Sequence, residues 1–245
     1  MGYNYKAGKK RIDTILTDKN DAKNANSIPT DNMFTNKNGY YGKVTSIFVD
    51  IRKSTKLFTN SKKSSVAKII RSFTSEIIEI LNDTNRIREI GIRGDCVYAI
   101  YANQSKEDDL DVFNKARYIN TFLKMLNITL SKMGMKNINA GIGIATHEDL
   151  VVKAGCEGTN IYSKIWIGQG VTYASKLSDM AKGKKKKPIL ITSEFYNSIN
   201  ELLFNKTSNI SKEDFIDYRL KPFDLFYGCD LYIEDFNKWI DGGMK

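Results

Sequence analysis

The sequence predicts an α/β fold of the α+β kind, with a βαββαβ order of elements and helices packed on one face of the sheet. Short β-branched and aromatic segments alternate with two long segments whose apolar residues recur every three or four positions. A Gly94-Asp95 pair separates two of the strand-like segments, which is typical of a hairpin. No repeat or linker divides the 245 residues, and 41% of them are hydrophobic, which suffices for one sizeable core.

The first half of the chain supplies most of these elements. Residues 44–51 are short, β-branched and aromatic, and predict a strand. Residues 64–82 place apolar side chains at helical spacing and predict an amphipathic helix. The hairpin is expected over residues 86–101, and a second helix over about 109–132.

The second half continues the pattern. Residues 139–146 predict a glycine-containing strand, with residues 150–154 as its hairpin partner. A third helix is expected from near Val171 and a further strand at residues 188–191. The tail, residues 218–240, is expected to form strands that end in a short helix.

The domain organisation expected from composition is an arm followed by one domain. Residues 1–40 are polar and rich in Lys, Asn and Asp, which indicates a polar N-terminal arm ahead of the domain, with a dimer contact as one role for it. Residues 41–245 are expected to form the domain with a C-terminal extension.

Composition also limits the partners and the compartment. The net charge of +10 is concentrated in residues 182–188, as either a solvated loop or a patch that binds phosphate or nucleic acid. Diffuse charge carries no specificity, so nucleic acid is not the expected partner. No run of about 18 apolar residues predicts a membrane span, and the N-terminus lacks an apolar signal core. Three scattered cysteines indicate neither a disulfide framework nor a zinc cluster, so a cytoplasmic location is expected.

Asp50 is the first candidate for chemistry, because it ends the apolar run Ile47-Phe48-Val49. An ionised carboxylate in an apolar setting is costly unless a cation or several donors compensate it. Side chains of a strand alternate between its faces, so Phe48 shares a face with Asp50, and Arg93 shares one with Asp95 at the hairpin turn.

If these strands are neighbours, the two aspartates converge at one end of the sheet. Two carboxylates and a main-chain carbonyl, which Ile51 is placed to supply, suit Mg²⁺ or Mn²⁺. The alternative is that Asp50 and Asp95 are ordinary turn residues, since Gly-Asp is common at hairpin tips.

Four ordered segments point to a known family: FVDIRKSTKLF, GIRGDCVYAIY, AGIGIATHEDLVVKAGCEG and WIGQGVTYASKL. Together they resemble the class III nucleotidyl cyclase domain over roughly residues 42–195. The DIR-S-T-L block, the RGD tip and the W-G…YASKL block resemble the bacterial Pycsar anti-phage cyclases, which are uridylate or cytidylate cyclases.

The resemblance implies a homodimer with active sites at the interface, each site combining metal-binding aspartates of one chain with transition-state residues of the other. It implies two Mn²⁺ or Mg²⁺ ions per site, held by Asp50, Asp95 and the carbonyl of Ile51. It also implies that Phe48 and Arg93 lie near the nucleotide.

The positions of two further catalytic residues depart from the family pattern. Where cyclases use Asn and Arg on one helix to place the ribose and stabilise the phosphate charge, this sequence has Thr172 and Lys176. Lysine supplies positive charge without the bidentate fork of arginine. This departure leaves open a catalytically weak, cyclase-like domain that senses nucleotides.

The base-reading positions also differ from those of purine cyclases. Adenylate cyclases place Lys, and guanylate cyclases Glu, where this sequence has Gly91, and the partner position is Ile165. Neither residue can hydrogen-bond a purine edge with its side chain, which argues against ATP and GTP. A donor such as Arg93 suits the carbonyl at position 4 of uracil, so UTP is preferred, with CTP as the alternative.

The resemblance further implies a role in anti-phage defence. The cyclic nucleotide product would be a second messenger that acts on a separate effector protein. A basic nucleic-acid-binding module remains an alternative that rests on charge alone. The single histidine, His147, is expected on a surface loop, Cys96 in core packing, and Trp166 in the core or an interface rather than stacked on a cofactor.

Overall fold

The computed structural model describes residues 2–19, 21–59, 61–82, 84–156, 158–181, 183 and 186–245. The helices are α1 (Tyr5–Thr17), α2 (Ser54–Thr59), α3 (Lys63–Leu81), α4 (Lys106–Lys132), α5 (Gln169–Met180), α6 (Ser193–Lys206) and α7 (Glu234–Asp241). The strands are β1 (Asp21–Asn24), β2 (Asn38–Ile51), β3 (Ile87–Arg93), β4 (Cys96–Tyr101), β5 (Ala140–Cys156), β6 (Ile161–Ile167), β7 (Ile189–Thr192), β8 (Ile216–Tyr218) and β9 (Phe226–Cys229). Three lysines of the basic 182–188 segment, Lys182, Lys184 and Lys185, lie outside the described residues.

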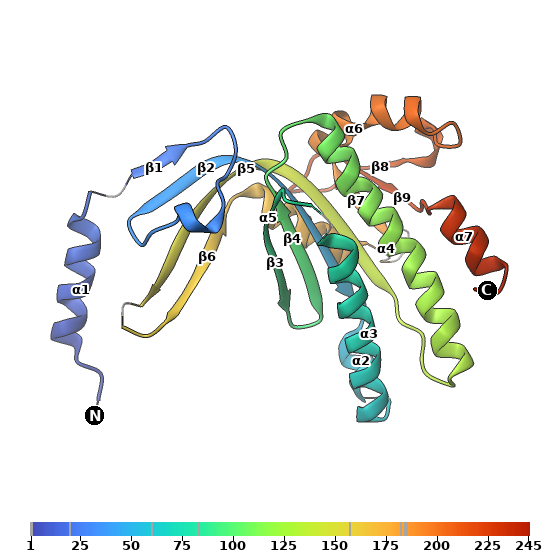
Figure 1. Cartoon of the computed structure of the whole chain (residues 1–245), viewed down its shortest axis with the longest axis horizontal. Coiled ribbons are helices and arrows are strands. Elements are labelled where there is room, and N and C mark those ends of the chain that lie inside the picture. The colour runs from blue at the N-terminus through green and yellow to red at the C-terminus, as the bar shows by residue number, and fades with distance from the viewer. Residues whose placement is uncertain are drawn as a thin grey trace.

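One mixed sheet organises the chain (Figure 1). Its strand order is β3-β4-β2-β5-β7-β9-β8, while β1 pairs with β2 and β6 pairs with β5. The long strand β2 is central, because it pairs antiparallel with both β4 and β5. The order β2, α3, β3, β4, α4, β5 confirms the predicted βαββαβ arrangement and the mixed fold class.

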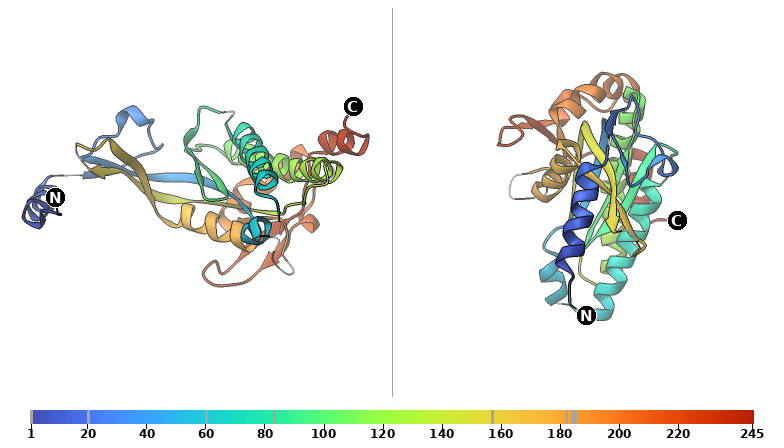
Figure 2. Two further views of the ribbon diagram at one scale, coloured as in Figure 1. Left: turned by 90° about the horizontal axis from the view of Figure 1, so that it is seen from below. Right: turned by 90° about the vertical axis from the view of Figure 1, so that its left-hand side faces the viewer.

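The two faces of the sheet are covered by different helices. Ile47 and Val49 of β2 belong to the main core, which contains apolar residues of α3, α4 and α6. On the opposite face, α5 packs directly on β5: a Cβ atom at Gly143 would lie 2.1 Å from the carbonyl oxygen of Ala174. Figure 2 shows α3 and α4 on one side of the sheet and α5 on the other. The expectation that the helices share one face is therefore wrong for α5.

The expected hairpin within residues 139–154 is also wrong. Strand β5 runs without a break from Ala140 to Cys156, and its antiparallel partner is β6, with Val152 opposite Ile165. The misleading signal was Asp149, a polar residue that is fully buried in the strand because it accepts hydrogen bonds from main-chain N–H groups of α5. His147 accordingly lies in β5 and is half-buried, not on a surface loop.

The N-terminal region divides into two parts. Helix α1 projects from the body of the molecule, and its apolar residues Ile15 and Leu16 are exposed (Figure 1). Strand β1 pairs in parallel with β2, and the following residues Ile28 and Phe34 are buried in a second cluster. The later part of the expected arm therefore packs on the sheet of the domain.

The C-terminal tail forms β8 and β9 and ends in α7, as the sequence predicts. Helix α6, which the sequence reasoning did not identify, contributes Phe195, Ile199 and Leu203 to the main core. Within the part of the chain that the structure describes, no helix is both long and apolar enough to cross a membrane.

Candidate active site

Asp50 and Asp95 converge at one end of the sheet, as the strand pattern predicts. Asp50 is the last but one residue of β2 and lies opposite Cys96 of β4 and Gly141 of β5. Asp95 occupies the β3–β4 turn directly before Cys96, next to Gly94, whose φ of 64° favours glycine. Both aspartates are half-buried, so each side chain is partly accessible to solvent.

The surroundings of Asp50 disfavour its ionised form, because nearby positive charge does not balance the negative charge. Burial, followed by the negative charges of Asp95 and Asp179, raises the pKa of Asp50 from 3.8 to about 6. Arg52 and the main-chain N–H of Ile51 act in the opposite direction without restoring the ordinary pKa. Three carboxylates and one arginine therefore leave a net negative site.

Asp179 is a site residue that the sequence reasoning missed. It lies on α5, and its Oδ1 is 3.8 Å from Nη1 of Arg52. Its position three residues after Lys176 was the available signal, because residues three and four apart share a helix face.

The donors at this end of the sheet fit a hard divalent cation. They include the carboxylate oxygens of Asp50 and Asp95, a ligand type that Mg²⁺ and Mn²⁺ prefer. Among the residues that the structure describes, no group of three or more His, Cys, Asp or Glu side chains could hold a metal ion. An ion here would therefore complete its shell with water or with phosphate oxygens of a ligand.

A pocket of about 560 Å³ lies on the same face of the sheet as Asp50. It brings together six residues singled out in the sequence, Phe48, Arg93, Ile165, Trp166, Thr172 and Lys176. They come from β2, β3, β6 and α5, which meet only in the folded chain. Phe48 is two residues from Asp50 on β2, so the Cα atoms of these two residues are roughly 7 Å apart along the strand.

The floor of the pocket is aromatic. Phe48 and Tyr98 pair across β2 and β4, with ring centroids 5.1 Å apart and planes inclined by 13°. Tyr98 then leans over Gly91 of β3, where an added Cβ atom would lie 2.5 Å from its Cζ. Tyr98 therefore occupies the space that a side chain at position 91 would need.

The start of α5 is fixed by the buried Asp149. Its Oδ1 accepts the N–H of Gly170 at 2.9 Å, and its Oδ2 accepts the N–H of Val171 at 3.0 Å. A carboxylate at a helix N-terminus satisfies free N–H groups and favours the helix dipole. Asp149 therefore positions the first turns of α5, which present Thr172 and Lys176 to the pocket.

Arg93 and Lys176 of the pocket are exposed, whereas Lys164, which also lines it, is half-buried and forms a salt bridge with Asp31 at 2.6 Å. Within the described part of the chain, neither Lys176 nor Arg93 forms a salt bridge, so Arg93 is not the partner of Asp50 or Asp95. An exposed guanidinium and an exposed ammonium that face one pocket suit an anionic ligand.

Two other residues flank the site. Cys96 is half-buried beside Asp50, and burial raises the pKa of its thiol to about 12, which makes it unreactive. Trp166 lines the pocket, but its indole N–H donates to Glu89 at 2.8 Å.

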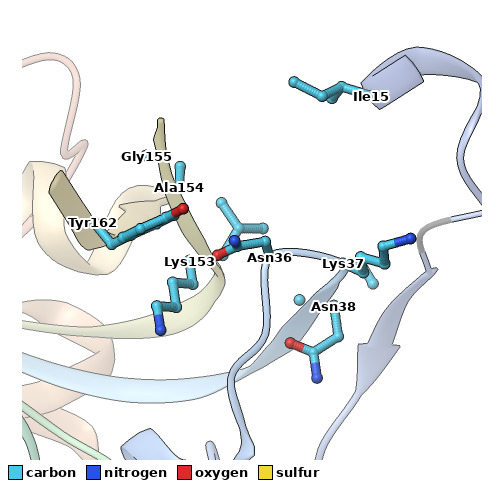
Figure 3. Close-up of a pocket in the computed structure, with 11 residues that line it drawn as sticks. Ile15, Asn36, Lys37, Asn38, Lys153, Ala154, Gly155 and Tyr162 are labelled. Atoms are coloured by element: carbon cyan, nitrogen blue, oxygen red, sulfur yellow. The ribbon is translucent and has the colours of Figure 1, made fainter. Parts of the chain in front are cut away.

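A second hollow of about 420 Å³ lies at the other end of the sheet. Figure 3 shows Lys153 and Tyr162 of the β5–β6 hairpin near Asn36 and Lys37, with Ile15 of α1 standing apart. Asn38, on its rim, is roughly 40 Å from Asp50 along β2 at about 3.3 Å per residue. This hollow is therefore separate from the carboxylates.

Comparison with known proteins agrees with this geometry. The adenylate and guanylate cyclase catalytic domain family matches residues 37–219. A protein of Treponema porcinum named uridylate cyclase is 46% identical over 244 residues, which cover 100% of this chain and 83% of that protein. A uridylate cyclase of Gulbenkiania mobilis is 30% identical over 248 residues, covering 98% and 96%. The crystal structure of the adenylyl cyclase CyaB from P. aeruginosa has a similar fold, with a TM-score of 0.62 at 20% identity over 78% of this chain and 95% of that one.

Proposed function

Because the chain belongs to the family of adenylate and guanylate cyclase catalytic domains and is a nucleotidyl cyclase, we propose that it converts UTP to 3′,5′-cyclic UMP and diphosphate. The observation that carries the choice of base is the pocket wall. It presents Gly91 beneath the Tyr98 ring, and Ile165, where a purine-selective site needs polar side chains. Arg93 faces the same pocket and supplies a donor for a uracil carbonyl.

In the proposed reaction the 3′-hydroxyl oxygen of the ribose attacks the α-phosphorus. The new O3′–P bond forms as the bond from the α-phosphorus to the bridging oxygen breaks, and diphosphate leaves. The proton of the hydroxyl passes to solvent or to a nearby base.

The chain's own residues divide this work. Asp50, Asp95 and the carbonyl of Ile51 would hold two divalent ions, Mn²⁺ or Mg²⁺, which when bound supply charge neutralisation at the phosphates. Lys176 adds positive charge where the phosphates become more negative. Thr172, one turn earlier on α5, offers a hydroxyl for the ribose.

We further propose that the active form is a homodimer with sites at the interface, in which the aspartates of one chain act with Lys176 of the other. Two exposed apolar residues on β6, Ile165 of the pocket wall and Ile167, support a surface that a second copy covers. The cyclic nucleotide would act as a cytoplasmic second messenger for a separate effector in anti-phage defence.

The proposal is tested by incubating the purified protein with Mn²⁺ and each of the four common ribonucleoside triphosphates separately. The products are separated by chromatography and identified by mass. Cyclic UMP as the main product supports the proposal. Cyclic AMP or cyclic GMP alone, or no cyclic product from any triphosphate, would refute it.

A further inference from the structure

Glu89 joins two walls of the nucleotide pocket. Its Oε1 accepts a hydrogen bond from the Tyr98 hydroxyl at 2.6 Å, and its Oε2 accepts one from the indole N–H of Trp166 at 2.8 Å. The three residues come from β3, β4 and β6, and all three line the pocket. One carboxylate therefore fixes the orientation of two aromatic rings, through hydrogen bonds that are stronger than those between neutral groups.

The Tyr98 ring is confined on its other sides as well. Its face stacks on Phe48, with ring centroids 5.1 Å apart. On the opposite side it covers Gly91, where any side chain would have to displace it, since a Cβ atom there would lie 2.5 Å from its Oη. A ring held by a stacking partner, a backbone and a hydrogen bond has little freedom to move aside for a ligand.

The proposal rests on the function proposed above and concerns its selectivity. We infer that Tyr98, fixed by Glu89, is a size filter that leaves room for a one-ring base and excludes the second ring of a purine. Glu89 is a positioning residue in this arrangement, because it acts through Tyr98 and Trp166.

The hydrogen bonding of the wall agrees with a filter that works by shape. The hydroxyl of Tyr98 and the indole N–H of Trp166 are both directed to Glu89, so neither donor is free to read a base edge. Burial, and next the bond to Glu89, raise the pKa of Tyr98 to about 12, so the hydroxyl keeps its proton throughout the working range of an enzyme. The wall therefore offers the base aromatic atoms without a free hydrogen-bond donor, and this holds at every such pH.

The test uses four variants of the full chain. Tyr98→Ala removes the ring. Tyr98→Phe keeps the ring and loses its hydrogen bond to Glu89. Glu89→Gln leaves one acceptor oxygen for the two donors of Tyr98 and Trp166. Tyr162→Ala, on β6 but outside this pocket, is the matched control for loss of a tyrosine ring. For each, kcat/KM is measured with UTP and with ATP in Mn²⁺, and folding is checked by circular dichroism.

The filter predicts that Tyr98→Ala lowers the ratio of kcat/KM for UTP over ATP by about 10- to 100-fold, the range in which pockets discriminate by size. Tyr98→Phe and Glu89→Gln lower the ratio less, mainly through KM, and Tyr162→Ala leaves it unchanged. If Tyr98→Ala does not fold, Tyr98→Phe and Glu89→Gln decide: an unchanged ratio in both overturns the inference. An unchanged ratio in folded Tyr98→Ala overturns it directly.

Failure of the proposed function is distinguishable from failure of the filter. If the wild-type protein cyclises no triphosphate, the dissociation constants of UTP and ATP are measured by calorimetry in the presence of Mn²⁺. Tighter binding of UTP that Tyr98→Phe and Glu89→Gln abolish would still support the filter. A UTP-to-ATP ratio that these variants leave unaltered would refute it.

Discussion

Replacing Asp50 by Asn should stabilise the metal-free protein while abolishing its activity. In the folded chain the pKa of Asp50 is about 6, against 3.8 for an unperturbed carboxyl, because of burial and the charges of Asp95 and Asp179. A raised folded-state pKa means that folding favours the protonated carboxyl. The ionised form therefore lowers stability, and this penalty grows as the pH rises from 3.8 through about 6.

The size of the penalty follows from the two pKa values. A rise from 3.8 to about 6 corresponds to about 3 kcal/mol at a fully buried site. Asp50 is only half-buried, so solvent screening reduces the expected gain on Asp50→Asn to about 1 kcal/mol above pH 7. For a chain of this size, that is a rise in Tm of about 2–4 °C.

The assay is thermal unfolding followed by circular dichroism in EDTA at pH 8 and at pH 4. Asp50→Asn should melt higher than the wild type at pH 8, and the difference should nearly vanish at pH 4. Asp217→Asn, which removes an exposed carboxylate from β8, is the matched control. A lower Tm for Asp50→Asn at pH 8, or the same gain at both pH values, would show that the ionised Asp50 carboxylate does not destabilise the fold.

The remaining predictions concern the metal, the cation and the dimer. Mn²⁺ should raise the Tm of the wild type more at pH 8 than at pH 5, since a protonated Asp50 competes with the ion; equal shifts would contradict the assignment. Asp95→Ala should lose turnover and keep its circular dichroism spectrum, and retained activity would mean that the metal site is misplaced. Lys176→Ala should lower kcat by about 100-fold or more, with partial recovery in Lys176→Arg; a change confined to KM would argue against a transition-state role. Mixing Asp50→Ala and Lys176→Ala chains should restore about a quarter of wild-type activity if sites form between chains, whereas no recovery would favour a site within one chain.

Local patterns were enough to predict most of the fold. Strand β2 was predicted over residues 44–51 from their β-branched and aromatic side chains, and alternation correctly placed Phe48 and Asp50 on one face, opposite the buried Ile47 and Val49 of the core. The β5–β6 hairpin was mispredicted because Asp149 resembles a turn residue in the sequence but is a buried cap of α5. The side of the sheet that α5 covers was also mispredicted, since it depends on the close approach of Ala174 to Gly143.

The site residues that lie within one local segment or one family motif could be predicted from the sequence. Contacts between distant segments could not. Asp50 of β2 lies opposite Cys96 of β4, the residue that follows Asp95, so strand alternation and a hairpin turn suffice to bring the two aspartates together. The Glu89–Trp166 contact joins residues 77 positions apart in different strands, and no local pattern signals it. Tyr98 was missed because a tyrosine in a strand is ordinary, and its role becomes visible only from the space that Gly91 leaves.

We propose that the nucleotide pocket and the aspartates Asp50 and Asp95 act together to cyclise a pyrimidine nucleotide. The most direct measurement is a competition in which the wild-type protein and Mn²⁺ are given equimolar UTP, CTP, ATP and GTP, and the initial rates of all four cyclic products are followed by mass spectrometry. Cyclic UMP should form fastest, and Asp50→Ala should form none. Faster formation of cyclic AMP or cyclic GMP, or undiminished cyclic UMP from Asp50→Ala, would contradict it.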